Sequence, residues 1–359
     1  MLIGIEAERA NLGQKTGVEN YAKQLILHLA EIDKVNNYRL YLRTNPEAWF
    51  LKLPKNFELR VLPFPIFWTQ LRISLEMLLN PVDALFVPAS ALPIIHPSNS
   101  VVTVHDLAWK FYPKTFTTFT KWFLNWSTGF SARGARKVIA VSKSTKKDLV
   151  SFYNIPEKKV SVVYHGYDKE AFGELKTNLK LPNKYVLFLS TLQPRKNLEG
   201  LIDAFRLLKK SNPDLPHKLV VVGGLGWKFE SILKKIEENK DIVEYLNYIS
   251  DNDRRYVLQH AEVLVQPAFY EGFGIQALDA LAVGVPLACS NVSSLPEVAG
   301  EAAVYFDPHN ILDIKNAISS ILYDQSLKDS LKQKGQLRLK EFSWEKCAEQ
   351  TLRVLTNVD

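Results

Sequence analysis

The stretch "YVLFLSTLQPRKNLEGLIDAF" (185–205) holds a strand, a loop and a helix in succession. The run "YVLFLS" has no polar alternation, which is typical of a strand covered by helices on both faces. The segment from Leu198 to Lys210 is predicted to be helical, and the loop before it carries Arg195 and Lys196. The stretch therefore predicts one βα unit of a parallel sheet, with two cations at the head of its helix.

The same alternation continues along the chain in two series, which are separated by the polar stretch 166–184. Apolar strands are expected at 2–5, 38–42, 83–87, 101–104, 137–141 and 160–164, and then at 185–190, 218–223, 262–267 and 285–290. Helices are expected at 18–32, 143–152, 198–210, 229–239 and 311–323, and from Ser343 onward. The pattern predicts an α/β protein of two Rossmann-like, doubly wound domains, 1–168 and 169–342, with a ligand cleft between them.

Composition narrows the class of protein. The 359 residues are 47% hydrophobic and 23% charged, as in folded globular proteins. No apolar run approaches the roughly 20 residues that span a bilayer, and the apolar start "MLIGIEAERA" is too short for a signal peptide. Cys289 and Cys347 fit no metal spacing and indicate a reducing compartment. We therefore expect a cytoplasmic protein.

The positive charge is concentrated in the first half of the chain. Residues 1–170 hold 22 Lys and Arg against 14 Asp and Glu, whereas residues 171–359 hold 23 against 24. A basic half favours an anionic partner, such as nucleic acid, a phosphorylated ligand or an anionic membrane surface. The alternative is a solvated basic face without a partner. No recognisable nucleic-acid-binding module accompanies the charge, so nucleic acid is the least favoured partner.

A second candidate for binding is "YEGFGIQALDAL" (270–281), which follows the expected strand 262–267. Gly272 and Gly274 let a ligand approach the backbone closely where a helix is expected to begin. Because the carboxylate of Glu271 repels phosphate, it should face a hydroxyl-rich group such as a sugar. Asp279, two helical turns on, could bind a ribose diol. The alternative is an ordinary glycine turn followed by a helix with one exposed acid.

Two further helix starts carry residues that favour binding of a phosphate group, two cations in one case and a glycine in the other. Arg195 and Lys196 beside a helix N-terminus favour a diphosphate, although they could also be solvated loop charges. Gly17 precedes the expected first helix, in "TGVENYAKQLI" (16–26), where a glycine loop can admit phosphate oxygens. That segment is neither G-x-G-x-x-G nor a P-loop, so a plain turn also fits it.

Histidine ends two strands of the first series. His105 and Asp106 follow the strand 101–104, at the edge where such sheets bind ligands. A metal-dependent phosphohydrolase would need further ligands at suitable spacing, and the sequence offers none. His165 follows the strand 160–164 and fits either a cleft residue or a packed turn histidine.

Two amphipathic stretches are rich in apolar side chains. "FYPKTFTTFTKWFLNWSTGF" (111–130) combines aromatic rings with Lys114 and Lys121, and "PIFWTQLRISLEMLL" (65–79) is similar. Rings with lysines suit a membrane interface or a sugar-binding surface. Helices that bury their aromatic side chains in the core are the alternative.

Taken in order, these motifs resemble glycosyltransferase family 4, and the likeness extends over nearly the whole chain. The segments that carry it are "TGVENYAKQLI", "TVHDLAW", "VIAVSKSTKKDLVSFYNIPEKKVSVVYHGYD", "STLQPRKNLEGLIDAF", "VGGLGW", "YISDNDRRYVLQHAEVLVQPAFYEGFG", "EGFGIQALDA" and "FSWEKCAEQTL". The resemblance implies the GT-B fold, in which helix 343–359 completes the first domain. Three positions depart from the common pattern: Asp279 stands in place of Glu, Thr191 in place of Arg, and His165 in place of Asn.

The resemblance also implies the roles of individual residues. Glu271 would face the transferred sugar, and His105 would lie near it. The donor diphosphate would contact Gly17, Arg195, Lys196 and the segment Gly272, Phe273, Gly274, while Asp279 would hold the ribose. The base would contact the backbone around Tyr248 and Ile249.

A retaining hexosyltransferase follows from this resemblance, with no metal and no cofactor other than its nucleotide-sugar donor. GDP-mannose is the favoured donor, because the "PRKN" and "HDLAW" segments look most like those of mannosyl- and rhamnosyltransferases of surface polysaccharide synthesis. The acceptor would be a glycan or a lipid-linked saccharide, and the basic first domain would contact an anionic membrane face. A GT-B nucleotide-sugar epimerase and a non-catalytic nucleotide-sugar-binding partner are the alternatives.

Overall fold

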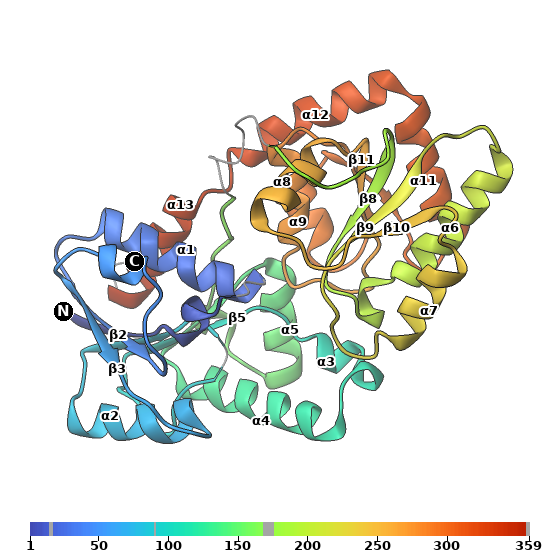
Figure 1. The fold of residues 1–359 in the computed structure, drawn as a ribbon. Coiled ribbons are helices and arrows are strands. Elements are labelled where there is room, and N and C mark those ends of the chain that lie inside the picture. Colours follow the sequence, from blue (N-terminus) through green and yellow to red (C-terminus); the bar gives the residue numbers. More distant parts are fainter. Residues whose placement is uncertain (14–16, 90, 168–175, 357–359) are drawn as a thin grey trace. The chain divides into compact units, whose positions relative to one another are not determined.

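The computed structural model describes residues 1–13, 17–89, 91–167 and 176–356, and it divides into two compact units (Figure 1). The first comprises Met1–Trp109, Thr118–Gly166 and Phe342–Asp359, and the second Lys110–Thr117 and Tyr167–Glu341. Residues 110–117, which we expected in the first domain, therefore group with the second unit. The expected boundary at 168 and 169 lies outside the described residues, as does part of the polar stretch 166–184.

The first unit is built on a seven-stranded parallel sheet with the order β3-β2-β1-β4-β5-β6-β7. Its strands are β1 (Leu2–Glu6), β2 (Asn37–Leu42), β3 (Phe57–Val61), β4 (Ala84–Val87), β5 (Ser100–Val104), β6 (Lys137–Ala140) and β7 (Val160–Val162). Its α-helices are α1 (Gly17–Ile32), α2 (Ser74–Leu79), the first half of α3 (Ala108–Phe111), α4 (Thr118–Gly134), α5 (Lys143–Tyr153) and α13 (Trp344–Thr356). The strand order reverses between β1 and β4, which makes their carboxyl ends a ligand position.

The second unit repeats this design with six parallel strands in the order β10-β9-β8-β11-β12-β13. They are β8 (Tyr185–Leu189), β9 (Lys218–Val222), β10 (Val243–Tyr245), β11 (Val263–Gln266), β12 (Leu287–Ser290) and β13 (Ala303–Phe306). Its helices are α6 (Leu198–Ser211), α7 (Glu230–Glu238), α8 (Asp251–Gln259), α9 (Ile275–Ala282), α10 (Leu295–Ala299), α11 (Ile311–Tyr323) and α12 (Gln325–Leu339). The reversal lies between β8 and β11, so ligand is expected where these two strands end.

The apolar runs that predicted strands are the buried strands of both sheets, and the prediction of two doubly wound domains is confirmed in fold class. Every residue of β4, β5, β8, β11 and β12 is buried. Three strands were not predicted, namely β3, β10 and β13. Each is an edge strand of its sheet and contains partly exposed residues, so it lacks a continuous apolar run.

The last helix completes the first unit by packing on α1. The amide of Lys346 donates to the Ser343 hydroxyl at 3.0 Å, so Ser343 is the N-cap of the helix that was expected from this residue onward. A Cβ atom on Gly166 would lie 2.0 Å from the backbone nitrogen of Trp344. The segment after β7 can approach the start of α13 this closely only because residue 166 is glycine.

The helices and the cysteines bear on the expectations about membrane spans and disulfides. Within the described ranges, none of the helices has both the length and the apolar character that a membrane span requires. The thiols of Cys289 and Cys347 are buried and unbridged, and burial raises the pKa of Cys347 to about 12. Both cysteines are therefore packing residues in this fold.

Candidate functional site

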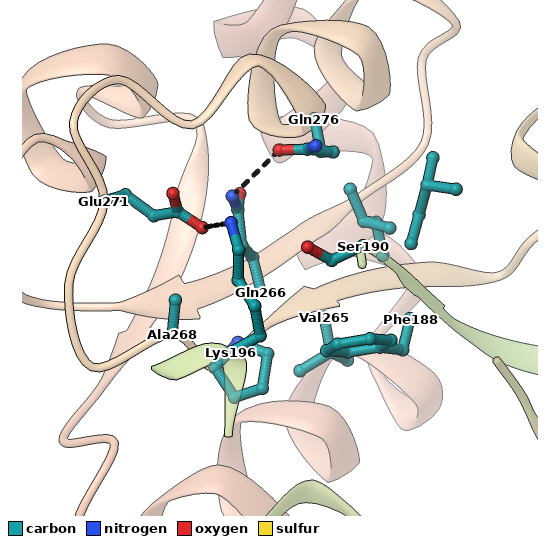
Figure 2. A pocket seen from close by; sticks show the side chains of 11 residues that line it. Phe188, Ser190, Lys196, Val265, Gln266, Ala268, Glu271 and Gln276 are labelled. Atoms are coloured by element: carbon teal, nitrogen blue, oxygen red, sulfur yellow. Dashed lines mark hydrogen bonds and ion pairs between the residues drawn. The ribbon is translucent and has the colours of Figure 1, made fainter. Parts of the chain in front are cut away.

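A small pocket lies at the reversal point of the second sheet, where β8 and β11 end (Figure 2). Its polar lining consists of Ser190 after β8, Lys196 before α6, Gln266 at the end of β11, Glu271 in the next loop, and Gln276 in α9. Figure 2 shows the Glu271 carboxylate directed toward an ammonium group and the amides of Gln266 and Gln276 facing each other. The sheet topology thus brings together polar groups up to 86 residues apart in sequence, Ser190 and Gln276.

The centre of this site is a buried cluster of three charges. Lys196 Nζ donates to Glu271 Oε1, and Arg195 Nη1 lies 3.3 Å from Glu271 Oε2. The same Arg195 nitrogen donates to the Tyr270 carbonyl at 2.6 Å. All three residues are buried, each with less than a tenth of its surface exposed. The alternative that these are solvated loop charges is therefore wrong, and their role in binding a diphosphate stays a prediction.

The protonation state of Glu271 follows from its two partners. Burial raises the pKa of this carboxyl, but the charges and hydrogen bonds of Lys196 and Arg195 outweigh burial and hold the pKa below its usual range. Glu271 is consequently ionised at neutral pH. Two cations and one carboxylate leave the cluster with a net charge of +1, which attracts an anion while keeping a negative group beside it.

Two adjacent serines hold the backbone of Glu271, and sequence reasoning missed both. The Glu271 amide donates to Ser293 Oγ at 2.8 Å, and Ser294 Oγ donates to the Glu271 carbonyl at 2.9 Å. Ser293 has a φ of 51°, in the left-handed region that non-glycine residues rarely adopt. The two hydroxyls lie just before Leu295 and Pro296, where α10 begins, and a serine pair before a proline is the signal that could have identified them.

The glycine segment after Glu271 ends at the start of α9. Gly274 is the N-cap of that helix with a φ of 87°, and a Cβ atom there would lie 2.6 Å from Leu295 Cδ2. The positive φ favours glycine here, and a larger residue would also displace the Leu295 side chain. Gly272 and Phe273 are buried, so the ring of Phe273 anchors the loop in the core.

The second acid of this stretch, Asp279, has a cationic neighbour that the sequence did not indicate. Arg254 Nη1 in α8 lies 3.0 Å from Asp279 Oδ2. Both side chains are partly exposed, with 30% of Arg254 and 20% of Asp279 accessible. Asp279 is thus held at the surface of α9 beside Arg254.

The expected base-contacting residues lie on the loop between β10 and α8. Tyr248 is exposed and Ile249 is partly exposed. The Tyr248 amide donates to Asn247 Oδ1 at 2.8 Å, and Asn247 has a φ of 57°. Residues 248 and 249 therefore lie in the turn that follows β10, the edge strand beside β9.

His105 lies at the end of β5 in the first unit, where the sequence placed it. Its Nε2 donates to the Pro88 carbonyl at 2.8 Å, because a carbonyl can only accept, and the opposite nitrogen Nδ1 is then the acceptor. Burial lowers the pKa of His105, although the hydrogen bond to Pro88 opposes the shift. A neutral His105 can therefore accept a hydrogen bond from a sugar hydroxyl through Nδ1.

His165 belongs to an aromatic cluster of the first unit. Its ring stacks on Tyr21 of α1, with 4.8 Å between centroids, and on Trp344 of α13, with 5.7 Å. His105 meets Tyr21 edge to face at 4.9 Å. His165 is 4% exposed, so the structure favours the packing interpretation over a cleft residue.

We expect His165→Asn to change how stability depends on pH. Burial and repulsion from His105 hold the pKa of His165 well below its usual range, so the ring is neutral in the folded state. The unfolded chain binds a proton below about pH 6.5, and stability is therefore lost as pH falls, by roughly 1.4 kcal/mol for each unit of lowered pKa. An asparagine side chain does not titrate, so the substitution removes this contribution. Urea unfolding between about pH 8 and 5 should show the wild type losing more stability than the variant, and parallel curves would contradict the packing assignment.

Two other residues lie at the same edge of the first sheet. Gly17 is the first residue of α1, and nothing lies within 4 Å of a Cβ atom built on it, while residues 14–16 of the expected glycine loop lie outside the described residues. Glu6 ends β1 and is buried, and burial raises its pKa to about 7. Sequence reasoning did not assign Glu6, although the strand-end rule that selected His105 applies to it.

Comparisons with known proteins decide the family. A family model described as Glycosyltransferase Family 4 matches residues 15–171, and one described as Glycosyl transferases group 1 matches residues 172–338. O-antigen chain mannosyltransferase B of Escherichia coli is 30% identical over 263 residues, which cover 70% of this chain and 69% of the relative. The chain belongs to glycosyltransferase family 4.

This family 4 enzyme is a hexosyltransferase with the GT-B fold. Serotype-specific mannosyltransferase WbdA of Escherichia coli is 25% identical over 277 residues. The match covers 73% of this chain and 34% of that relative. The Anabaena protein HepE, solved in complex with UDP-glucose, is 15% identical with a TM-score of 0.75 over 99% of both chains. That structural likeness supports the two-domain fold predicted from the sequence.

The structure of the enzyme brings the expected residues together in two groups. The first group is in the second unit, where Arg195, Lys196 and Glu271 form one cluster, and Gly272, Phe273 and Gly274 connect it to α9, which carries Asp279. The second group consists of Gly17 and His105, at the start of α1 and the end of β5 in the first unit. Among the described residues, no group of three or more His, Cys, Asp and Glu is arranged to hold a metal ion.

Proposed function

We propose that the enzyme transfers mannose from GDP-mannose to a glycan or lipid-linked acceptor in surface polysaccharide synthesis, with retention of the anomeric configuration. The observation that carries the proposal is the buried cluster of Arg195, Lys196 and Glu271 at the reversal point of the second sheet. A diphosphate needs cations, and a sugar that develops positive charge needs a carboxylate. This cluster offers both within one pocket.

The relatives support the choice of donor. Two mannosyltransferases of Escherichia coli resemble the chain over about 70% of its length, and their names place one of them in O-antigen chain synthesis. The structural neighbour HepE binds UDP-glucose, so a nucleoside diphosphate sugar suits this fold. We favour GDP-mannose, since sequence relatives are better guides to the sugar than neighbours that share only the fold.

Charge development explains the role of each group in the cluster. The bond from the anomeric carbon to the β-phosphate oxygen breaks, and a bond to the acceptor oxygen forms on the same face of the sugar. Lys196 and Arg195 would stabilise the negative charge that grows on the departing GDP, so we expect no requirement for a metal. Ionised Glu271 would stabilise the positive character of the anomeric carbon. The leaving phosphate would take the proton of the acceptor hydroxyl.

The remaining expected residues would position the two substrates. Asp279 would accept from the ribose hydroxyls, and the backbone of Tyr248 and Ile249 would contact the base. Amides at the start of α9, after Gly272, Phe273 and Gly274, would donate to phosphate oxygens. In the first unit, His105 would accept from a sugar hydroxyl through Nδ1, and Gly17 would admit phosphate oxygens at the N-terminus of α1.

A thermal-shift panel tests the donor. The enzyme is heated with GDP-mannose, UDP-glucose, UDP-GlcNAc, dTDP-rhamnose and the free nucleoside diphosphates, each with and without EDTA. We expect the guanosine ligands to raise the melting temperature most, because binding to the folded state alone stabilises it by mass action, and we expect EDTA to change nothing. Selective stabilisation by another nucleotide would contradict the choice of GDP-mannose, and no stabilisation at millimolar concentration would contradict the donor site.

A further inference from the structure

Helix α4 carries an uncovered stripe of aromatic side chains. Phe119, Trp122 and Trp126 follow one another at helical spacing and are 67%, 61% and 40% exposed. The indole rings of Trp122 and Trp126 are nearly parallel, with centroids 6.3 Å apart. Burial of these rings in the core, the alternative that the sequence left open for this stretch, is therefore not what the fold adopts. An exposed row of large apolar rings indicates a surface that binds something.

The stripe continues onto helix α2 of the same unit. Leu78 and Leu79 at the end of α2 are 62% and 64% exposed. The loop between β4 and β5 joins the two helices, since the Ile95 amide donates to Ser74 Oγ of α2 and the Leu92 amide donates to Ser131 Oγ of α4. Figure 1 shows both helices along one edge of the first unit. We call the exposed apolar residues of this edge, which are Leu78, Leu79, Ile94, Phe119, Trp122 and Trp126, the apolar face.

The charged residues of α4 and of the segment that follows it are all basic. From Thr118 to Lys147 the chain contains seven Lys and Arg and no Asp or Glu. Arg133 near the end of α4 is exposed, and Lys121 lies one residue before Trp122. On α2, the acid Glu76 is buried and paired with Arg60 and Arg72. A partner at this face therefore meets apolar groups and positive charge together.

We propose that the apolar face docks the enzyme onto a bilayer of anionic phospholipids, with the rings of α4 and the leucines of α2 inserted at headgroup depth. Tryptophan is the side chain that favours the membrane–water interface, because its indole combines a large apolar surface with one donor. Lysine and arginine beside it bind anionic headgroups. A protein partner would find the same apolar surface, but α4 combines its exposed rings with basic residues and no acid, which favours anionic lipid. The inference does not depend on the donor sugar, since docking needs no nucleotide.

Vesicle co-sedimentation of the full chain tests this proposal. Wild type, Trp122→Ser/Trp126→Ser and Leu78→Ser/Leu79→Ser are mixed with vesicles of phosphatidylcholine alone or mixed with phosphatidylglycerol. Leu337→Ser/Tyr323→Ser is the matched control, because both side chains are equally exposed in the second unit, at 62% and 59%. We expect the wild type to sediment with the anionic vesicles only, and each apolar-face variant to lose binding by roughly tenfold or more. The control should bind like the wild type.

Three results would overturn the proposal. One is equal binding by the wild type and both apolar-face variants, and a second is no binding of the wild type to anionic vesicles. The third concerns the Trp122→Ser/Trp126→Ser variant. If light scattering shows that its oligomeric state has changed while its vesicle binding has not, the face is a protein contact. Should a variant fail to fold, quenching of wild-type tryptophan fluorescence by brominated lipid in anionic vesicles decides the matter, since inserted indoles are quenched and solvated ones are not.

Discussion

Replacing Glu271 by glutamine is expected to lower kcat/KM for mannosyl transfer from GDP-mannose by about 10²- to 10³-fold. Glutamine keeps the shape of the side chain and can still accept a hydrogen bond from Lys196 or Arg195, but it carries no charge. The positive character that develops at the anomeric carbon then lacks its counter-charge. GDP release from GDP-mannose, measured with mannose-terminated oligosaccharides as trial acceptors, gives the rate.

For the same variant we expect the affinity for free GDP to increase, although transfer is slower. Without the carboxylate, the buried charge at Arg195 and Lys196 rises from +1 to +2, so free GDP should bind more tightly even as transfer fails. The uncompensated cations should also lower the free energy of unfolding, by about 3 kcal/mol. Glu301→Gln is the control, since Glu301 is exposed and only its charge changes. Unchanged transfer by Glu271→Gln would contradict the role assigned to Glu271.

Gly166→Ala is expected to lower the free energy of unfolding by about 4 kcal/mol or more, although it adds only one methyl group. The new methyl group would lie 2.0 Å from the Trp344 nitrogen, 2.5 Å from the Ser343 carbonyl carbon and 2.6 Å from the Trp344 Cα. All three atoms are backbone, so no side chain can rotate away. The start of α13 would have to move away from residue 166, and this movement should separate Trp344 from the ring of His165, on which it now stacks.

Denaturant unfolding followed by near-ultraviolet circular dichroism measures this loss. Gly17→Ala is the matched control, because the space around Gly17 is open and the residue begins a helix. That control should change stability by less than about 1 kcal/mol. Equal stability of Gly166→Ala and the wild type would show that α13 does not pack against residue 166.

The fold could be predicted from the sequence wherever burial is complete. β8 and β11 are apolar throughout because helices cover both faces, and so they stand out from their surroundings. β3 reads "FELRV" and is partly exposed at the sheet edge, where polar residues are tolerated and no apolar run forms. The three missed strands are therefore those whose identity depends on a neighbouring strand rather than on their own composition.

The candidate site could be predicted only as a set of residue types. Arg195, Lys196 and Glu271 were selected as ligand-binding groups in two separate segments, and their contact with one another was not predicted. The structure pairs them directly, across 75 residues of sequence between Lys196 and Glu271. No local pattern encodes that contact, because it arises from the adjacency of β8 and β11. Asp279 and Arg254, 25 residues apart, illustrate the same limit.

The measurement that tests the central claim most directly is titration calorimetry of GDP-mannose with the wild type and Lys196→Met, in buffer containing EDTA. Methionine is close in length to lysine and removes only the charge and its hydrogen bonds. We expect the wild type to bind without metal and the variant to bind roughly 30-fold or more weakly, because a hydrogen-bonded charge pair with phosphate is lost. Equal dissociation constants for the two proteins would contradict the claim that this cluster holds the donor diphosphate.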